Sequence, residues 1–484
     1  RNADISPEDE AYDVDEDYRQ HMRKIVKKRN RLAPVRLEIQ SGTRDEKAIE
    51  FLCSRLNLSR QQVFFTKSPI RMNYVFSLEG LLPPESKTAL CYPPFTPRFP
   101  AFLRQEEKIL PQVLRRDALL FYPFESMDPF LHLVREASSD PNVLSIKITI
   151  YRLASKAKLA EYLCAAAENG KEVTVLMELR ARFDEQNNIQ WAERMEEAGC
   201  TILYGTEGIK VHSKICLITR RERGKIQYIT QVGTGNYNEK TAKQYTDLCL
   251  ISAQPQLGAD AAALFQNMAT SNLEGDYKLL LASPYQLRDK VMALMDREIA
   301  KGDKGYIFLK LNSITDRKLI DKLAQASQAG VTVVMNVRGI CCLRPGLPGL
   351  TENITVFSIV GRYLEHSRIY QFGRGEDADL YISSADFMTR NTERRVEIAC
   401  PVLDQQVRRA VFHIIDVLLS DNVKTRFLGP DGLWYQRKSA DEPVSSQDVF
   451  LQQGLEGFGL PAQPARPVKQ KKGNPISRLL HRFR

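Results

Sequence analysis

Two short stretches of the sequence share the pattern histidine, serine, basic residue. The first is "VHSKICLI", with His212 and Lys214, and the second is "EHSRIYQF", with His366 and Arg368. A neutral imidazole is a good nucleophile near pH 7, because its unperturbed pKa is about 6.5. A nearby lysine or arginine can neutralise charge that spreads over phosphoryl oxygens. The pattern suits phosphoryl transfer through a phosphohistidine, although a single His-x-Lys pair is more often an accident of the surface.

A loop of small residues follows each motif. "QVGTGN" ends in Asn236, and "ISSAD" ends in Asp386. Backbone N–H groups of such a loop can bind phosphate oxygens. If the two stretches belong to duplicated halves that face one cleft, the basic residues of both motifs surround a single anion.

The segments around the motifs alternate between strand and helix patterns. Buried strands are predicted at 142–153, 171–183, 201–205, 305–314 and 331–340, with helices at 156–170, 188–199 and 317–330. The stretch "VTVLMELR" recurs as "VTVVMNVR" at an offset of 158 residues. Chance similarity of two units is the alternative, but the shared order of motifs favours duplication. We predict an α/β fold with two duplicated domains, each a mixed sheet flanked by helices.

Composition divides the rest of the chain. The first twenty residues carry eight Asp or Glu against two Arg, and residues 466–484 carry seven Lys or Arg and no acid. The predicted order of segments is an acidic disordered start (1–20), a partial α+β head domain (21–118), two catalytic domains (119–276 and 277–455) and a basic tail (456–484). The tail is expected to be flexible, with a basic amphipathic contact to a membrane or a polyanion as the alternative.

The overall charge and the cysteines limit the class of protein. The 484 residues carry a net charge of +10, which favours an anionic partner. The nine cysteines form no C-x-x-C pair, which argues against a disulfide framework and a structural zinc site and favours a reducing compartment. No apolar run approaches about twenty residues. We expect a cytoplasmic protein, with peripheral contact at the inner membrane as the alternative.

Several longer stretches resemble one enzyme family. The stretches are "IKITIYR", "ELRARFDE", "GTGNYNEKTAKQYTD", "SIVGRYLEHSRIYQFG" and "SSADFMTRNTERRVEIACP". They are similar to the type 1 polyphosphate kinases, which are built on a tandem phospholipase D-like scaffold. The resemblance runs over residues 20–435. It implies reversible transfer of the terminal phosphate of ATP to inorganic polyphosphate, through a phosphohistidine and with Mg²⁺.

The resemblance also assigns roles to residues. His212 matches the phosphorylated histidine, and His366 matches a second histidine that contacts the nucleotide and acts as acid or base. Tyr245 and Arg338 match nucleotide contacts, and Asn236 lies in the loop expected to bind nucleotide phosphates.

Two arginines, Arg152 and Arg182, match positions of the magnesium-phosphate site. An arginine cannot ligate a cation, so we expect both to bind the phosphates that carry Mg²⁺. The expected partners are ATP or ADP, polyphosphate and a second copy of the chain, with no specific nucleic acid.

The chain departs from the family pattern at two places. Gln231 stands where the family usually has another histidine, and a glutamine cannot relay a proton near neutral pH. If that histidine relays protons, Gln231 should lower turnover, whereas if the histidine only orients the phosphate, Gln231 can replace it through its hydrogen bonds. The chain begins at Arg1, so we expect the family's N-terminal helical domain, which contributes to nucleotide binding and precedes the head, to be missing.

Two other functions are alternatives. A phospholipase D-like phosphodiesterase would act on diesters without ATP, but the first motif has Thr219 where that superfamily usually has an acid. A catalytically weakened remnant would bind polyphosphate without forming a phosphoenzyme, and its binding would weaken with salt.

Overall fold

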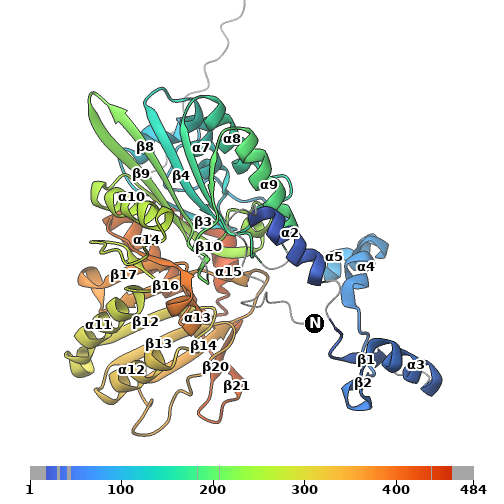
Figure 1. Ribbon diagram of the computed structural model, residues 1–484. Helices are drawn as coiled ribbons and strands as arrows, with labels where there is room; N and C mark the ends of the chain where they lie inside the picture. Colours follow the sequence, from blue (N-terminus) through green and yellow to red (C-terminus); the bar gives the residue numbers. More distant parts are fainter. Residues whose placement is uncertain are drawn as a thin grey trace, which may run out of the picture.

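The computed structural model describes residues 18–29, 33–40, 45–181, 184–206, 208–437 and 439–459. The main body contains two mixed sheets, one above the other in Figure 1, and a smaller N-terminal part stands beside it. Most of the predicted acidic start, most of the basic tail and Arg182 lie outside the described residues.

The first sheet has its strands in the order β10-β9-β8-β4-β5-β6, and β3 pairs with β10. Its strands are β3 (Ala118–Tyr122), β4 (Val143–Ile150), β5 (Glu172–Met177), β6 (Thr201–Leu203), β8 (Ile215–Glu222), β9 (Lys225–Gly233) and β10 (Tyr245–Ser252). Its helices are α7 (Asp128–Ser139), α8 (Lys158–Glu168), α9 (Glu185–Glu197) and α10 (Pro255–Ala269). β4, β5 and β6 are parallel, whereas β3, β8, β9 and β10 pair antiparallel to their neighbours.

The second sheet repeats this arrangement, in the order β11-β19-β17-β16-β12-β13-β14, and adds β20 and β21 at its edge. Its strands are β11 (Leu281–Ala282), β12 (Tyr306–Leu311), β13 (Thr332–Val337), β14 (Ile354–Ile359), β16 (Arg368–Phe372), β17 (Asp379–Ser383), β19 (Ile398–Pro401), β20 (Thr425–Leu428) and β21 (Trp434–Gln436). Its helices are α11 (Leu287–Ile299), α12 (Arg317–Gln328), α13 (Thr389–Glu393), α14 (Gln405–Ser420) and α15 (Ser446–Gln453). The same strand order in both sheets confirms the predicted duplication of a mixed α/β unit.

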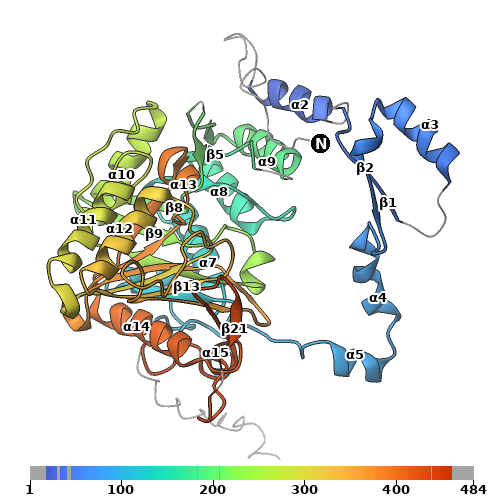
Figure 2. The ribbon, with the colours of Figure 1, turned by 90° about the horizontal axis from the view of Figure 1, so that it is seen from below.

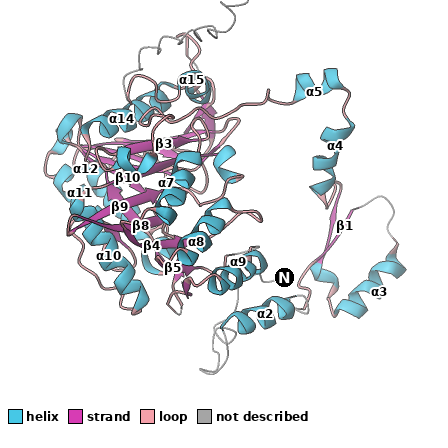
Figure 3. Ribbon diagram, turned by 90° about the horizontal axis from the view of Figure 1, so that it is seen from above, coloured by secondary structure: helices cyan, strands magenta, loops and turns pink. Residues whose placement is uncertain are grey.

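Local sequence explains why these elements form. All six residues of β12 are buried, as expected for a strand of a sheet covered by helices, and its one charged residue, Lys310, pairs with Glu365 at 2.9 Å. Asp316 caps α12 by accepting a hydrogen bond from the Leu319 amide, and α12 buries Leu319 and Leu323, four residues apart. Figure 3 shows the strands of the main body enclosed by helices.

The two halves are joined by short strands that cross between them. β15 (Leu364–Glu365), directly before His366, pairs in parallel with the start of β10. β7 (Lys210–Val211), directly before His212, pairs in parallel with β18 (Arg395–Val396). One apolar core runs through residues of both sheets, so each histidine motif is fixed against the opposite half.

The N-terminal part contains helices and a two-stranded sheet. Its elements are α2 (Tyr18–Arg29), β1 (Leu37–Gln40), α3 (Glu46–Leu56), β2 (Val63–Thr66), α4 (Val75–Leu81), α5 (Pro84–Leu90) and α6 (Ile109–Val113). Arg19 of α2 forms an ion pair of 2.6 Å with Glu196 of α9. Figures 1 and 2 both show α3 to α5 as an arm apart from the main body, in agreement with the predicted partial α+β head.

Across the described ranges, no helix combines the length and the apolar character that crossing a bilayer requires.

Candidate active site between the two halves

Both histidines lie at breaks between strands. His212 follows β7 and precedes β8, and its amide and that of Ser213 donate to the Val396 carbonyl of the other half, at 2.9 and 2.8 Å. In the second motif the Ser367 amide donates to the Thr246 carbonyl at 2.7 Å. The crossed backbone hydrogen bonds fix each motif against the opposite half of the protein.

His212 is held by an acid from the second half. Its Nδ1 lies 2.9 Å from the Glu397 carboxylate, whose side chain is fully buried. Burial lowers the pKa of His212 to about 3, against the opposing effect of Glu397. Burial alone would raise the pKa of Glu397, but His212 and Lys214 outweigh it and lower that pKa to about 2. The ionised Glu397 can only accept, so Nδ1 carries the proton and Nε2 keeps a free lone pair.

His366 has the reciprocal arrangement. Its Nδ1 lies 2.8 and 2.9 Å from the two carboxylate oxygens of Asp247, which belongs to the first half. The Thr234 hydroxyl donates to the same carboxylate at 2.6 Å. Burial lowers the pKa of His366, and Asp247 opposes this effect. The ring of Tyr245 lies 5.2 Å from the imidazole, centroid to centroid, so this half-site has an aromatic wall.

Lys214 connects the two half-sites. Its ammonium is buried, donates to the His212 carbonyl and lies 5.4 Å from the centre of the Tyr151 ring. Burial lowers its pKa to about 7. The charges that act on it belong to Glu397, Arg368, Arg395 and Asp247. Because these residues come from both halves, the two motifs form one electrostatic unit, as the shared-cleft hypothesis requires.

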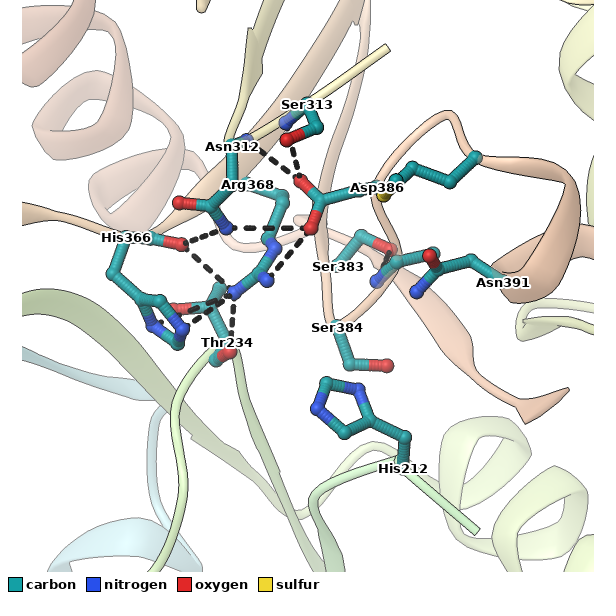
Figure 4. A network of polar contacts seen from close by, with 12 residues as sticks. His212, Thr234, Asn312, Ser313, His366, Arg368, Ser383, Ser384, Asp386 and Asn391 are labelled. Carbon is teal, nitrogen blue, oxygen red and sulfur yellow. Dashed lines mark hydrogen bonds and ion pairs between the residues drawn. The ribbon is translucent and has the colours of Figure 1, made fainter. Parts of the chain in front are cut away.

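Arg368 is committed to protein partners. Figure 4 shows its guanidinium among Asp386, the His366 carbonyl and Thr234. One terminal nitrogen donates to Asp386 at 2.9 Å, and the other donates to the carbonyls of His366 and Thr234 at 2.8 and 3.2 Å. The sequence predicted that Arg368 binds phosphate as Lys214 does. The observed hydrogen bonds of Arg368 instead connect the GTGN loop to the second motif.

Of the remaining expected nucleotide residues, Arg338 is linked to His366 through Asn312. Arg338 donates from Nε to the Asn312 side-chain oxygen at 2.8 Å, and Asn312 donates to the His366 carbonyl at 3.2 Å. Burial lowers the pKa of Arg338, and Tyr245 is among the groups whose charge acts on it. Oδ1 of Asn236 is buried without a hydrogen-bond partner in the described part of the chain.

Of the two expected magnesium-phosphate residues, Arg152 lies near the first motif, and Arg182 is outside the described residues. Arg152 follows Tyr151, whose ring lies 4.7 Å from that of His212, and its Nε is 2.9 Å from Asp184. The described residues contain no group of three His, Cys, Asp or Glu side chains that could hold a metal ion. Asp247, Asp386 and Glu397 each face a histidine or an arginine instead.

Gln231 lies in the interior of the first sheet. Its side chain is buried, accepts a hydrogen bond from the Tyr237 hydroxyl and donates to Cys249 Sγ at 3.4 Å. These contacts give the glutamine a packing role beneath the site rather than a place beside either imidazole.

Sequence reasoning missed the two orienting acids and two arginines. Asp247 and Glu397 bind the two histidines. Arg390 and Arg395 lie close enough to Tyr151 and Glu397 to interact with them electrostatically. The signal was present, because residues 234–247 and 384–397 align without a gap and bring Asp247 onto Glu397. The same alignment brings Tyr245 onto Arg395.

Comparison with known proteins gives a consistent match. Sequence models for the polyphosphate kinase middle domain, C-terminal domain 1 and C-terminal domain 2 match residues 1–78, 108–274 and 280–447. A polyphosphate kinase of Bacillus cereus is 43% identical over 451 residues, which cover 92% of this chain and 64% of that protein. One of Pseudomonas aeruginosa is 41% identical, over 96% of this chain and 67% of that protein.

A solved structure agrees with these sequence matches. The crystal structure of a polyphosphate kinase from Porphyromonas gingivalis aligns with a TM-score of 0.77 at 34% identity, over 87% of this chain and 64% of that one. The chain thus spans about two thirds of the length of these relatives.

Proposed function

Because the chain belongs to the polyphosphate kinase family, we propose that it transfers the terminal phosphate of ATP reversibly to inorganic polyphosphate through His212. The observation that carries the proposal is the neutral imidazole of His212, whose side chain is 12% exposed and whose Nδ1 is held by Glu397. This geometry leaves Nε2 as the nucleophile and stabilises the positive charge that the ring gains on reaction.

In the first step Nε2 of His212 attacks the γ-phosphorus of ATP. The Nε2–P bond forms, the bond from phosphorus to the β,γ-bridging oxygen breaks, and its electron pair leaves with ADP. In the second step a terminal oxygen of polyphosphate attacks the phosphorus, the P–Nε2 bond breaks, and its electron pair returns to the ring. Nδ1 keeps its proton throughout, because Glu397 remains ionised at neutral pH.

The two half-sites support different roles. His366, with the Tyr245 ring beside it, suits the nucleotide side, where it donates a proton to or accepts one from the departing ADP oxygen. Around His212 the cations Lys214, Arg390 and Arg395 suit the equatorial oxygens of the transferred phosphoryl group.

Magnesium enters this proposal as part of the substrate. Mg²⁺ prefers oxygen ligands, and the acids of the site are engaged by His212, His366 and Arg368. The described side chains therefore do not fit a protein-built magnesium site, and no step is assigned to such an ion. Arg152 and Arg182 are proposed to contact the phosphates of the magnesium–ATP complex.

The experiment is incubation with magnesium and ATP labelled in its γ-phosphate, followed by acid and base treatment of the protein. The wild-type chain should acquire acid-labile, base-stable label, and His212→Ala should not. His132→Ala, which changes a histidine outside the site, is the matched control. Label that survives in His212→Ala would reject the assignment. Diester hydrolysis without ATP would favour the phosphodiesterase alternative, and polyphosphate binding without label would favour the remnant.

Two partner proposals concern other surfaces. Self-association through the arm is supported by its exposed apolar side chains, among them Phe76 (88% exposed), Leu81 (79%) and Leu90 (72%). Sedimentation of the wild-type chain and of Phe76→Ser tests it, and a monomer at every concentration would contradict it. Membrane contact through residues 456–484 is proposed from their charge alone, and cosedimentation with anionic vesicles tests it.

A further inference from the structure

The two buried acids differ in the neutral groups that donate hydrogen bonds to them. Glu397 accepts from the Ser384 hydroxyl at 2.6 Å, and Asp247 accepts from the Thr234 hydroxyl at the same distance. These hydroxyls occupy matching positions, 150 residues apart. Each acid thus has two neutral donors, its histidine and its hydroxyl. Glu397 has a third, because the side-chain amide of Asn391 donates to its Oε1.

Asn391 is held in place by burial and by the hydrogen bond of its neighbour in the second half. It is 2% exposed and lies on α13, where the next residue, Thr392, donates from its hydroxyl to Asp316 at 2.8 Å. Asp316 is the residue that caps α12. The matching residue of the first half, Thr241, donates instead to the backbone carbonyl of Asn238 at 3.2 Å. The amide contact is therefore a property of the His212 half-site.

We propose that Asn391 is a positioning residue for His212: with Ser384 it holds the Glu397 carboxylate where it accepts the Nδ1 proton, so that Nε2 faces the substrate. The inference rests on the proposed transfer through His212. Without the amide, Glu397 loses the donor on Oε1 and can rotate away from the imidazole. The ring then samples both neutral tautomers, and only the one with the proton on Nδ1 can attack phosphorus. The charged and titratable groups that face His212 and Glu397 are Lys214, Arg395 and Tyr151.

The test compares Asn391→Leu, which keeps the volume and removes the donor, with Thr241→Val at the matching position. Histidine ¹⁵N shifts report the tautomer directly, and the chain has six histidines to assign. At pH 7.5 the wild type should show His212 protonated on Nδ1 alone, and Asn391→Leu should show a measurable Nε2–H population. The rate of covalent labelling should fall about 10–100-fold with the KM for ATP unchanged, because the amide orients the nucleophile. Thr241→Val should change neither quantity.

An unchanged tautomer and labelling rate in folded Asn391→Leu would overturn the proposal. If that variant does not fold, Ser384→Ala removes the other donor on Glu397 and should give the same two changes. The ¹⁵N measurement needs no turnover, so it tests the positioning role even if the wild-type chain forms no phosphoenzyme. A wild-type chain that forms no phosphoenzyme would count against the proposed function and not against the positioning role of Asn391.

Discussion

Replacing Glu397 by glutamine should disable a histidine that lies 185 residues away in the sequence. The substitution keeps the shape of the side chain and removes its charge. A neutral amide can also donate to Nδ1, which would place the histidine proton on Nε2 and block the nucleophile. Both effects act on His212, although Glu397 belongs to the other half of the duplicated protein.

The magnitude follows from the charge that the ring gains in the transition state. Nδ1 lies 2.9 Å from the carboxylate oxygen, and the charge centres are about 4 Å apart. At an effective dielectric constant of about 20, two unit charges at that separation attract by about 4 kcal/mol. Each 1.36 kcal/mol is a factor of ten in rate, so Glu397→Gln should slow phosphorylation about 10³-fold.

Time courses with γ-labelled ATP, quenched in alkaline detergent so that the acid-labile phosphohistidine survives, measure this rate in a single turnover. Glu222→Gln, an acid at the far end of β8 that pairs with Arg220 at 2.9 Å, is the matched control and should label at the wild-type rate. Thermal unfolding of both variants shows whether the fold is intact. Wild-type labelling by folded Glu397→Gln would refute the crossed pairing as the source of His212 reactivity.

Three further changes test other parts of the site. Arg368→Ala should lower the free energy of unfolding by about 3–5 kcal/mol, because Asp386 is left buried without its cation. Lys214→Met should lower it less, because the pKa of Lys214 is already lowered to about 7. Equal losses of the two variants in urea unfolding would contradict this contrast. Gln231→His should lower the melting temperature without adding a limb to the pH–rate profile, since the side chain packs between Tyr237 and Cys249; a faster, newly pH-dependent enzyme would instead restore the proton-relay interpretation. In the unfolded chain His212 becomes protonated below its ordinary pKa of 6.5, whereas in the folded chain it stays neutral down to about pH 3. Lowering the pH from 6.5 to 5 should therefore lower the free energy of unfolding by about 2 kcal/mol. His212→Gln should lose this pH dependence in unfolding experiments at the two pH values.

The sequence was a good guide to the elements and a partial guide to their pairing. Apolar runs and glycine stops predicted β4, α8, α12 and β13 within about three residues of their observed bounds, because these signals are local, whereas β5 ends six residues before its predicted end. The antiparallel insertion of β8, β9 and β10 beside the parallel strands depends on tertiary packing that no local pattern carries. The partners of Glu397 are likewise set by the crossing of β7 and β18 between the halves.

The same limit explains the residues whose contacts differ from the prediction. Spacing alone made Arg368 equivalent to Lys214, since both stand two residues after a histidine. Their surroundings differ because the loop after the first motif ends in Asn236 and the loop after the second ends in Asp386. Asp386 binds the guanidinium of Arg368, whereas a neutral amide at the matching position cannot hold a cation in the same way.

This difference shows how a duplicated site can perform an unsymmetrical reaction. Duplication supplies two imidazoles, each oriented by a buried acid of the opposite half, and so makes one rigid frame from two copies. Three matched pairs then break the symmetry: Tyr245 against Arg395, Asn236 against Asp386, and Thr241 against Asn391. On the His366 side these substitutions add an aromatic ring and neutralise the local cation. On the His212 side they add a cation and a third donor to the acid. Attack on a polyanion needs a neutral nucleophile among cations, and a nucleotide base can stack on an aromatic ring. The different roles proposed for the two half-sites therefore follow from a few side chains and not from the shared backbone.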